Sequence, residues 1–242
     1  MTSATRRLPR SARRARLFHS GVYLLTLPLL LTGWWLLLGG EGHPSPLARL
    51  FGSPDILIHR RLGWALAAVG LLPLLLGRRG LVGFARETLR LDRGDARWWA
   101  RLPSAAFSGR FARHEGHFDP GQRVANVVLV LGLVAVTASG TGLTLLHGGP
   151  MFARLHQIHR WSTFAITPVI AGHLLVVSGL LPGYRGVWRA MHLGGRVSGA
   201  TARRLWPAWT ERAEVEERLR RSGVSRRPGR AVRGPSRRPA GT

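Results

Sequence analysis

Histidines are the residues of this sequence whose positions could support chemistry. Four of them, His19, His59, His159 and His173, fall within or at the edges of long apolar stretches. Titratable side chains at membrane depth are rare and usually functional. His159 and His173 are 14 residues apart. At about 100° and 1.5 Å per residue this leaves them about 40° apart on one helix face and about 21 Å apart along the axis.

The other two histidines match these depths on other apolar stretches. His59 shares the depth of His159, and His19 shares that of His173, so two pairs across helices are expected. Paired neutral imidazoles in an apolar bundle suit six-coordinate haem iron, and a closed coordination sphere favours electron transfer. His156 lies about 100° off the shared face and is not expected to be a ligand. Structural buried histidines or a metal-ion path are the alternatives; such a path would want acidic residues, which these stretches lack.

The elements that must carry these histidines are membrane-spanning helices. A span needs roughly 20 apolar residues, and hydrocarbon requires it to be helical. We expect an all-α membrane protein, a bundle of four transmembrane helices. The predicted spans are 17–40, 56–77, 124–147 and 158–182.

Arginine counts predict the orientation. All 36 basic residues are Arg, against 11 acids, and the formal charge is +25. Segment 1–16 holds six Arg, 78–123 ten and the part after Tyr184 fifteen, whereas 41–55 and 148–158 hold one each. Basic loops stay in the cytoplasm. Both termini and the 78–123 loop are therefore expected in the cytoplasm, and the protein in a bacterial inner membrane.

The remaining composition narrows the function classes. The sequence has no Cys, which excludes disulfides, thiolate metal sites, iron–sulfur clusters bound by this chain and covalent c-type haem. After a basic N-terminus (1–16) and the membrane domain (17–184), we expect a cytoplasmic segment at 185–217. The Arg- and Pro-rich tail, 218–242, is expected to be disordered. Its charge favours contact with anionic lipid over nucleic acid.

Several residues beside the histidines have two interpretations. Arg60 and Arg61 follow His59, and Arg160 follows His159. These arginines could pair with haem propionates, or could be arginines at a membrane edge. Small residues in the third span indicate close helix packing rather than cofactor contact; they are Gly132, Ser139, Gly140 and Gly142. The amphipathic 78–123 loop carries Trp98 and Trp99, as a segment lying on the inner membrane surface would.

Three segments resemble a known family. FDPGQRVANVVLVLGLVAVTASGTGL resembles the segment that opens the third span in the cytochrome b (gamma) subunit of membrane-bound formate dehydrogenases. RETLRLDRGDARWWARLPSAAFSGRF resembles that family's cytoplasmic loop, and the stretch from HRWSTFAITPVIAGH to GRVSGATARRLWPAW its fourth span and the following segment. The resemblance covers about residues 10–212. The b-type cytochromes of nickel–iron hydrogenases and the bacterial cytochrome b561 group share the bundle.

The resemblance implies two haems b and electron flow from an iron–sulfur (beta) subunit, itself fed by a molybdenum or tungsten catalytic subunit, to menaquinone or another quinone. His59 and His159 would bind the outer haem, and His19 and His173 the inner one.

The quinone site would lie near His173 and Asp119–Gln122, with Asp119, Gly121 and Gln122 as candidate contacts. The family commonly has Asn where this chain has Asp119. Asp119 could instead cap the third span, with Pro120 at its first position.

No substrate chemistry is expected on this chain alone. The alternatives are a cytochrome subunit of a hydrogenase or another respiratory oxidoreductase, a stand-alone cytochrome b561, or a haem-free membrane anchor.

Overall fold

The computed structural model describes residues 7–39 and 43–221. Four long helices dominate it: α1 (Arg13–Leu37), α3 (Asp55–Leu76), α6 (Pro120–Leu145) and α7 (Gly149–Ser178). The shorter elements are β1 (Arg7–Pro9), α2 (Pro46–Phe51), α4 (Arg78–Thr88), α5 (Asp95–Ser108), η1 (Pro182–Tyr184), α8 (Arg189–His192), β2 (Arg196–Ser198), α9 (Gly199–Leu205) and α10 (Pro207–Arg221).

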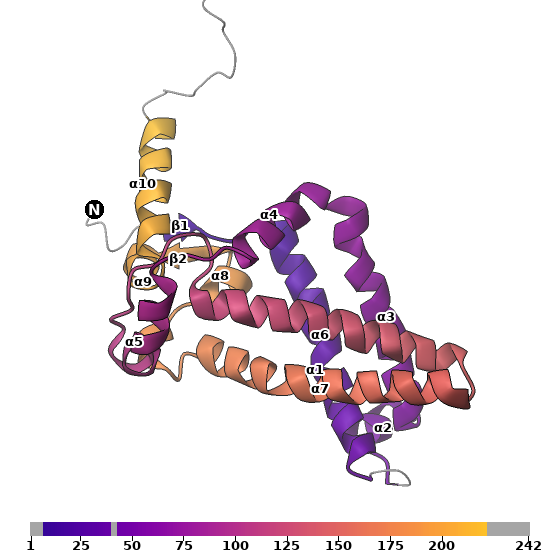
Figure 1. Ribbon diagram of the computed structural model, residues 1–242. Coiled ribbons are helices and arrows are strands. Elements are labelled where there is room, and N and C mark those ends of the chain that lie inside the picture. Colours follow the sequence, from indigo (N-terminus) through magenta and orange to yellow (C-terminus); the bar gives the residue numbers. More distant parts are fainter. Residues whose placement is uncertain (1–6, 40–42, 222–242) are drawn as a thin grey trace, which may run out of the picture.

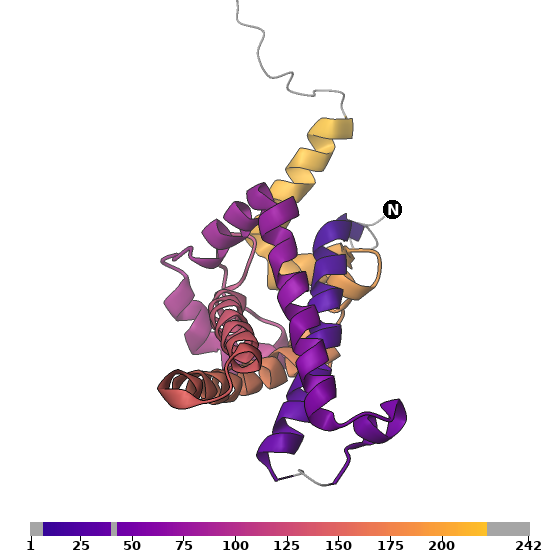
Figure 2. The ribbon, with the colours of Figure 1, turned by 90° about the vertical axis from the view of Figure 1, so that its right-hand side faces the viewer.

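The four predicted apolar helices are present, each long and apolar enough to cross a membrane. They form two hairpin pairs: α1 packs along α3, and α6 packs along α7, with α3 and α6 also in contact. The second pair crosses the first at a large angle; Figure 2 looks nearly along α6 and α7 while α1 and α3 are seen from the side (Figures 1 and 2). Because of this crossing, the two ends of α7 can meet different helices of the first pair.

The third span begins earlier than predicted. It starts at Pro120 rather than 124, because Asp119 caps it: its carboxylate accepts a hydrogen bond from the backbone N–H of Gln122 at 2.8 Å. The capping interpretation of Asp119 is thus confirmed. The charged Arg123, which marked the end of the predicted loop, lies inside the first turn of α6 and is buried.

The fourth span also begins earlier, at Gly149 rather than 158. Pro150 suits the first turn of a helix, and the left-handed backbone of Gly149 (φ +87°) makes the sharp entry from α6. The predicted spans were limited by charged residues, and Arg154 interrupts the apolar run, so the sequence did not indicate the first turns of this helix. The connection between α6 and α7 is therefore only three residues, 146–148.

Most of the short elements lie at one end of the molecule, where α6 begins and α7 ends; they are β1, α5, η1, α8, β2, α9 and α10, whereas α2 lies at the opposite end (Figure 1). We call this part, residues 7–12, 89–119 and 179–221, the cap. Its two strands pair antiparallel, with Leu8 opposite Val197. Both side chains are fully buried, in a core that also contains Ala106, Tyr184, Ala202, Leu205 and Trp206. The start of the chain, the 78–123 connection and the segment after α7 therefore lie on the same side of the four helices.

Buried Arg123 ties the cap to the first turn of α6. Its guanidinium donates to Asp92 at 2.8 Å and Asp95 at 3.1 Å, and also to the backbone carbonyls of Arg90, Phe118 and Glu115. A guanidinium with all its donors paired can be buried without a large penalty. Arg123 thus holds the connection folded over the helix start.

Two predictions about the cap differ from the structure. Trp98 was expected on the membrane surface, yet only 2% of it is exposed, because it packs into the cap; Trp99 is exposed. The disordered tail was expected from residue 218, but α10 continues to Arg221. The rest of the predicted tail, 222–242, lies outside the described residues.

Candidate functional site

The structure brings the four predicted histidines together as two pairs. The ring centroids of His59 and His159 lie 6.1 Å apart, and those of His19 and His173 lie 6.2 Å apart. Two imidazoles bound to one metal ion, with bonds of about 2 Å and about 1 Å from nitrogen to ring centre, have centroids about 6 Å apart. Each pair therefore has the spacing of two trans ligands on one iron. We call His19 and His173 the near pair, since they lie toward the cap, and His59 and His159 the far pair.

The tautomer of His59 is fixed by Thr32 of α1. The Thr32 hydroxyl donates to the carbonyl of Pro28 at 2.8 Å, so its oxygen can only accept from Nδ1–H of His59, at 2.9 Å. Nε2 of His59 is left with the lone pair that a metal needs. Hydrogen bonds of this kind orient metal-binding histidines.

His159 is oriented in the same way by α6. Its Nδ1 lies 3.0 Å from the carbonyl oxygen of Val136, which can only accept, so Nδ1 carries the proton and Nε2 the lone pair. Ser139 Oγ lies 3.3 Å from the same Nδ1 and itself donates to Ala135 at 2.6 Å. Both histidines of the far pair are thus presented as neutral ligands with a free Nε2.

Glycines leave room for these rings. A Cβ at Gly33 would lie 3.2 Å from Cε1 of His59, and one at Gly140 would lie 3.0 Å from Cε1 of His159. On α3, Gly63 and Gly70 are about 40° and 20° from the direction of His59, and a Cβ at either would meet no atom within 4 Å. The face of α3 that carries His59 is therefore open enough for a large flat group.

The small residues of α6 divide between two roles. A Cβ at Gly132 would collide with Ile166 of α7, and one at Gly142 would lie 2.6 Å from Leu155. These two glycines allow the close packing of α6 on α7 that the sequence predicted. Ser139 and Gly140 instead contact His159, which the packing prediction did not foresee.

The near pair belongs to a larger ring cluster. The His192 ring centroid lies 6.0 Å from that of His19, and Tyr23 lies 5.6 Å from His19 and 5.5 Å from His192. Nδ1 of His19 is buried and lacks a hydrogen-bond partner within the part of the chain that the structure describes. Helical spacing in the sequence does not point to His192, because the position of this residue at the end of α8 depends on the turn that follows.

The donor set fits a haem better than a bare metal ion. Within residues 7–39 and 43–221, His, Cys, Asp and Glu form no group of three or more that could hold a metal ion. Two imidazoles alone are too few ligands for a bare metal ion, but they suit a haem, because its porphyrin would supply the remaining ligands. His156, the excluded candidate, is exposed on α7, whereas His159 is half-buried.

The predicted propionate partners are at the surface. Arg60 and Arg160 directly follow the far pair in sequence, and both are exposed. Among the described residues, the acidic side chains form their ion pairs with arginines other than Arg60 and Arg160. Arg160 lies 6.0 Å over the ring of Phe164. Both arginines are therefore available to an anion near the far pair, but nothing in the fold directs them to one.

The predicted quinone residues are packed differently from the expectation. The space above Gly121 is filled by the indole of Trp98, since a Cβ at Gly121 would lie 2.7 Å from it. Asp119, the last residue of the 89–119 part of the cap, is buried, and this burial raises the pKa of its carboxyl group. Gln122 is half-buried.

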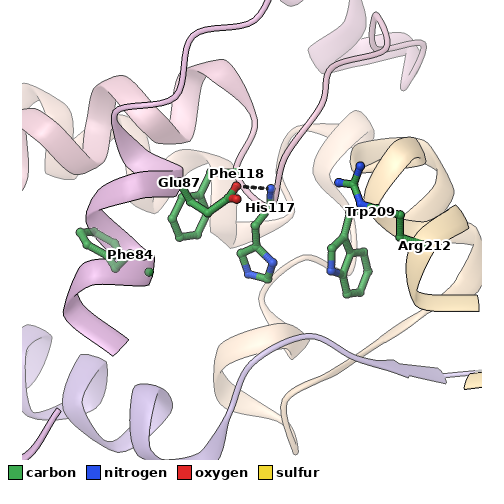
Figure 3. Close-up of a pocket in the computed structure, with 7 residues that line it drawn as sticks. Phe84, Glu87, His117, Phe118, Trp209 and Arg212 are labelled. Carbon is green, nitrogen blue, oxygen red and sulfur yellow. Dashed lines mark hydrogen bonds between the residues drawn. The ribbon is translucent and has the colours of Figure 1, made fainter. Parts of the chain in front are cut away.

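A cavity opens beside this segment. It has a volume of about 500 Å³ and is lined by Gly83, Phe84, Glu87, His117, Phe118, Trp209 and Arg212. Figure 3 shows His117 between Trp209 and the α4 residues Phe84 and Glu87, with Glu87 accepting a hydrogen bond from the backbone N–H of His117 at 2.7 Å. The cavity thus combines aromatic walls with titratable groups, next to the start of α6.

Arg10 packs against His117 and two tryptophan rings inside the cap. Its guanidinium lies 4.0 Å from the Trp206 ring centroid and 4.4 Å from that of Trp209, and it bonds Nδ1 of His117 at 3.0 Å. Burial lowers the pKa of Arg10 to about 9, although Asp119 and Glu87 partly offset this. Burial and the charge of Arg10 lower the pKa of His117 to about 3. Sequence reasoning missed Arg10 because it resembled the other basic residues of the N-terminus.

Together, four apolar helices and two pairs of histidines with the spacing of iron ligands define a membrane haem protein of the b type, since a chain without Cys cannot attach haem covalently. The prokaryotic cytochrome b561 family matches residues 10–194, and the chain belongs to this family. No curated protein matches the sequence. The chain is accordingly a multi-pass membrane cytochrome of the b type that functions in electron transfer.

Proposed function

We propose that this chain holds two haems b and carries electrons across the bacterial inner membrane to the quinone pool. His59 and His159 would bind one haem, and His19 and His173 the other. The observation that supports this most directly is the pair of centroid distances, 6.1 and 6.2 Å, in different halves of α7.

The chain's own contribution is to present and insulate the ligands. A haem held by either histidine pair would supply a one-electron carrier. Thr32 and Val136 hold the far-pair protons on Nδ1. The apolar helices around the histidine pairs favour neutral imidazoles.

Haem stoichiometry tests the ligand assignment. The purified protein should contain two haems per chain by pyridine haemochrome assay. His159→Ala and His173→Ala should each retain one, and they should remove different components of the spectrum. His156→Ala is the control and should keep two. One haem in the unmodified protein, or loss of haem from His156→Ala alone, would refute the assignment; a colourless protein would support a haem-free anchor.

We further propose that quinone is reduced on the cap side, and the concentration of arginines there supports a cytoplasmic position for the cap. The 500 Å³ cavity is the candidate for the head group, because it adjoins Asp119 through Phe118 and has His117 and Glu87 in its wall. A quinone that accepts two electrons also needs two protons, and carboxylates near water can relay them. Asp119 and Gln122 would act from the start of α6.

Substitutions at these positions test the quinone site. Asp119→Asn keeps the helix cap, because Asn caps as well as Asp, but it removes the acid. This variant and Gln122→Ala should slow quinone reduction while both haems remain reducible by dithionite. His43→Ala, at the opposite end of the molecule, should be normal. Unchanged quinone reduction in the first two variants would remove this segment from the site.

The resemblance at the third and fourth spans supports an iron–sulfur subunit of a formate dehydrogenase-type complex as the electron donor, with a molybdenum or tungsten catalytic subunit behind it. The family match supports the broader group, which leaves a hydrogenase, another respiratory oxidoreductase or a stand-alone cytochrome b561 as alternatives. Purification in mild detergent, with identification of the co-purifying subunits, separates these possibilities.

A further inference from the structure

A second cavity lies beside the near pair, between the start of α1 and the turn after α8. Its volume is about 390 Å³. The polar and charged residues in its wall are Arg13, Arg16, Ser20, Tyr23 and His192. Residues from opposite ends of the described chain therefore build one basic pocket.

The fold fixes this pocket through the turn at Gly194 and Gly195. Both glycines have φ of +73°, a left-handed backbone that other residues rarely adopt. The carbonyl of Gly195 accepts hydrogen bonds from the backbone N–H groups of Arg10 at 2.8 Å and Ser11 at 3.1 Å. A Cβ at Gly195 would collide with the guanidinium of Arg16. The turn is thus tied to the start of α1, and Arg16 lies against it.

The pocket has a surplus of positive charge. Within the described residues, no acidic side chain pairs with Arg13 or Arg16, and the first turn of α1 contains no acid. The residue that precedes α1, Ala12, provides no side-chain cap. Arginines suit carboxylates and phosphates, and the N-terminus of a helix adds to the attraction for an anion. An anionic group in the pocket would therefore interact favourably with the arginines and with the N-terminus of α1.

The same pocket adjoins the near pair. Tyr23 and His192 line it, and their ring centroids lie 5.6 and 6.0 Å from that of His19. A porphyrin held between His19 and His173 would be much wider than either imidazole ring, so its edge would extend past both rings. One edge of haem b carries two propionate carboxylates, and these anions need cationic partners.

We propose that Arg13 and Arg16 bind the propionates of the haem held by His19 and His173, with Ser20 and Tyr23 as hydrogen-bond donors. This inference rests on the proposed ligand role of the near pair. It assigns the inner haem an anion site that the sequence did not indicate, since Arg13 and Arg16 there resembled ordinary basic residues at a membrane edge.

Redox titration of single-charge variants tests the proposal. Arg16→Gln, alone and with Arg13→Gln, should lower one of the two haem midpoint potentials and leave the other unchanged, because a cation near haem favours the reduced state. Arg14→Gln is the matched control; it removes the same charge from the same helix turn but lies outside the pocket. Arg16→Lys, which keeps the charge, should restore most of the lost potential.

Three results would overturn the inference. The potentials could stay unchanged in the double variant, or Arg14→Gln could produce an equal shift, which would indicate a general surface-charge effect. Loss of bound phospholipid phosphorus from the double variant, with both potentials unchanged, would assign the pocket to a lipid phosphate. Selective loss of the near-pair haem, with the far-pair haem and the elution volume of the folded protein retained, would support the proposal. Fewer than two haems in the unmodified protein would instead refute the proposed function.

Discussion

The hydroxyl of Thr32 is the residue-scale feature that makes His59 a suitable ligand. It accepts the proton of Nδ1 because its own proton is used by the carbonyl of Pro28. Without this partner, the imidazole could rotate or change tautomer, and a buried N–H would be left unpaired. The quality of the far site therefore depends on a side chain that does not touch the iron.

Thr32→Val should weaken haem binding at the far pair. Loss of an outer hydrogen bond typically reduces metal affinity about 10–100-fold, while the shape of the side chain is preserved. The rate of haem transfer to excess apomyoglobin measures this. Thr26→Val is the control, since Thr26 is buried on the same helix and its Oγ1 lacks a partner among the described residues. Equal transfer rates for the two variants would contradict the role of Thr32.

The sequence predicted which histidines would meet but not all of their neighbours. Spacing along a helix is periodic, so the 14 residues between His159 and His173 indicate a shared face. His192 is the last residue of the short helix α8, and its contact with His19 depends on the Gly194–Gly195 turn. Such tertiary contacts leave no periodic signal in the sequence. The role of the four histidines as iron ligands stays a prediction.

At the scale of elements, the contact between α6 and α7 determines where His159 lies. Gly132 sits beneath Ile166 so closely that a methyl group there would collide. Ile166 is itself 1% exposed, among the most buried side chains of the four long helices. The two helices can therefore separate only at the cost of this packing.

Gly132→Ala should destabilise the protein by about 1–3 kcal/mol, the usual cost of overpacking a well-packed contact. Unfolding by SDS in mixed micelles, followed by circular dichroism, measures the free-energy difference. Gly80→Ala in α4 is the control, because a Cβ there meets no atom within 4 Å; it should be neutral or slightly stabilising. If the two variants unfold alike, the close approach at Gly132 is not stabilising.

The helices were predictable as elements, but their ends were not. Apolar length identified all four spans, whereas a limit set by charge excluded Arg123 and Arg154, which lie inside α6 and α7. The strand pair was also missed. Each strand has three residues, too few to show alternation, and they come from opposite ends of the described chain.

At the scale of the whole molecule, Arg10 joins the N-terminal segment to the 78–123 connection and to α10. It contacts His117, Trp206 and Trp209. Because His117 is buried beside this cation, its pKa falls from 6.5 to about 3. The folded cap therefore requires His117 to be neutral.

The stability of the cap should decrease in acid. The contribution of a neutral His117 is fully present above pH 6.5, the unfolded value, and is lost as pH falls towards about 3. His114, whose pKa burial also lowers, adds to this trend, while the raised pKa of Asp119 opposes it. Thermal unfolding in detergent should thus give a lower Tm at pH 5 than at pH 7.5.

Variants separate His117 from the other groups. His117→Gln should reduce the difference in Tm between the two pH values, because the substituted side chain does not titrate. His43→Gln changes an exposed histidine at the opposite end and should leave the difference as it is in the unmodified protein. A pH dependence that is identical in the two variants would show that His117 does not control cap stability.

At the scale of the whole molecule, β1 and β2 also hold the start of the chain beside the segment after α7. With arginines concentrated on that side, the cap is expected in the cytoplasm. The chain has no cysteine, so single-cysteine variants can be labelled without background. In intact spheroplasts, a membrane-impermeant maleimide should label His43→Cys but not Ser108→Cys, and inverted vesicles should give the opposite result. Both positions are exposed. The reverse pattern would place the near pair and its arginines at the outer surface, where the proposed site of quinone reduction on the cytoplasmic side could not exist.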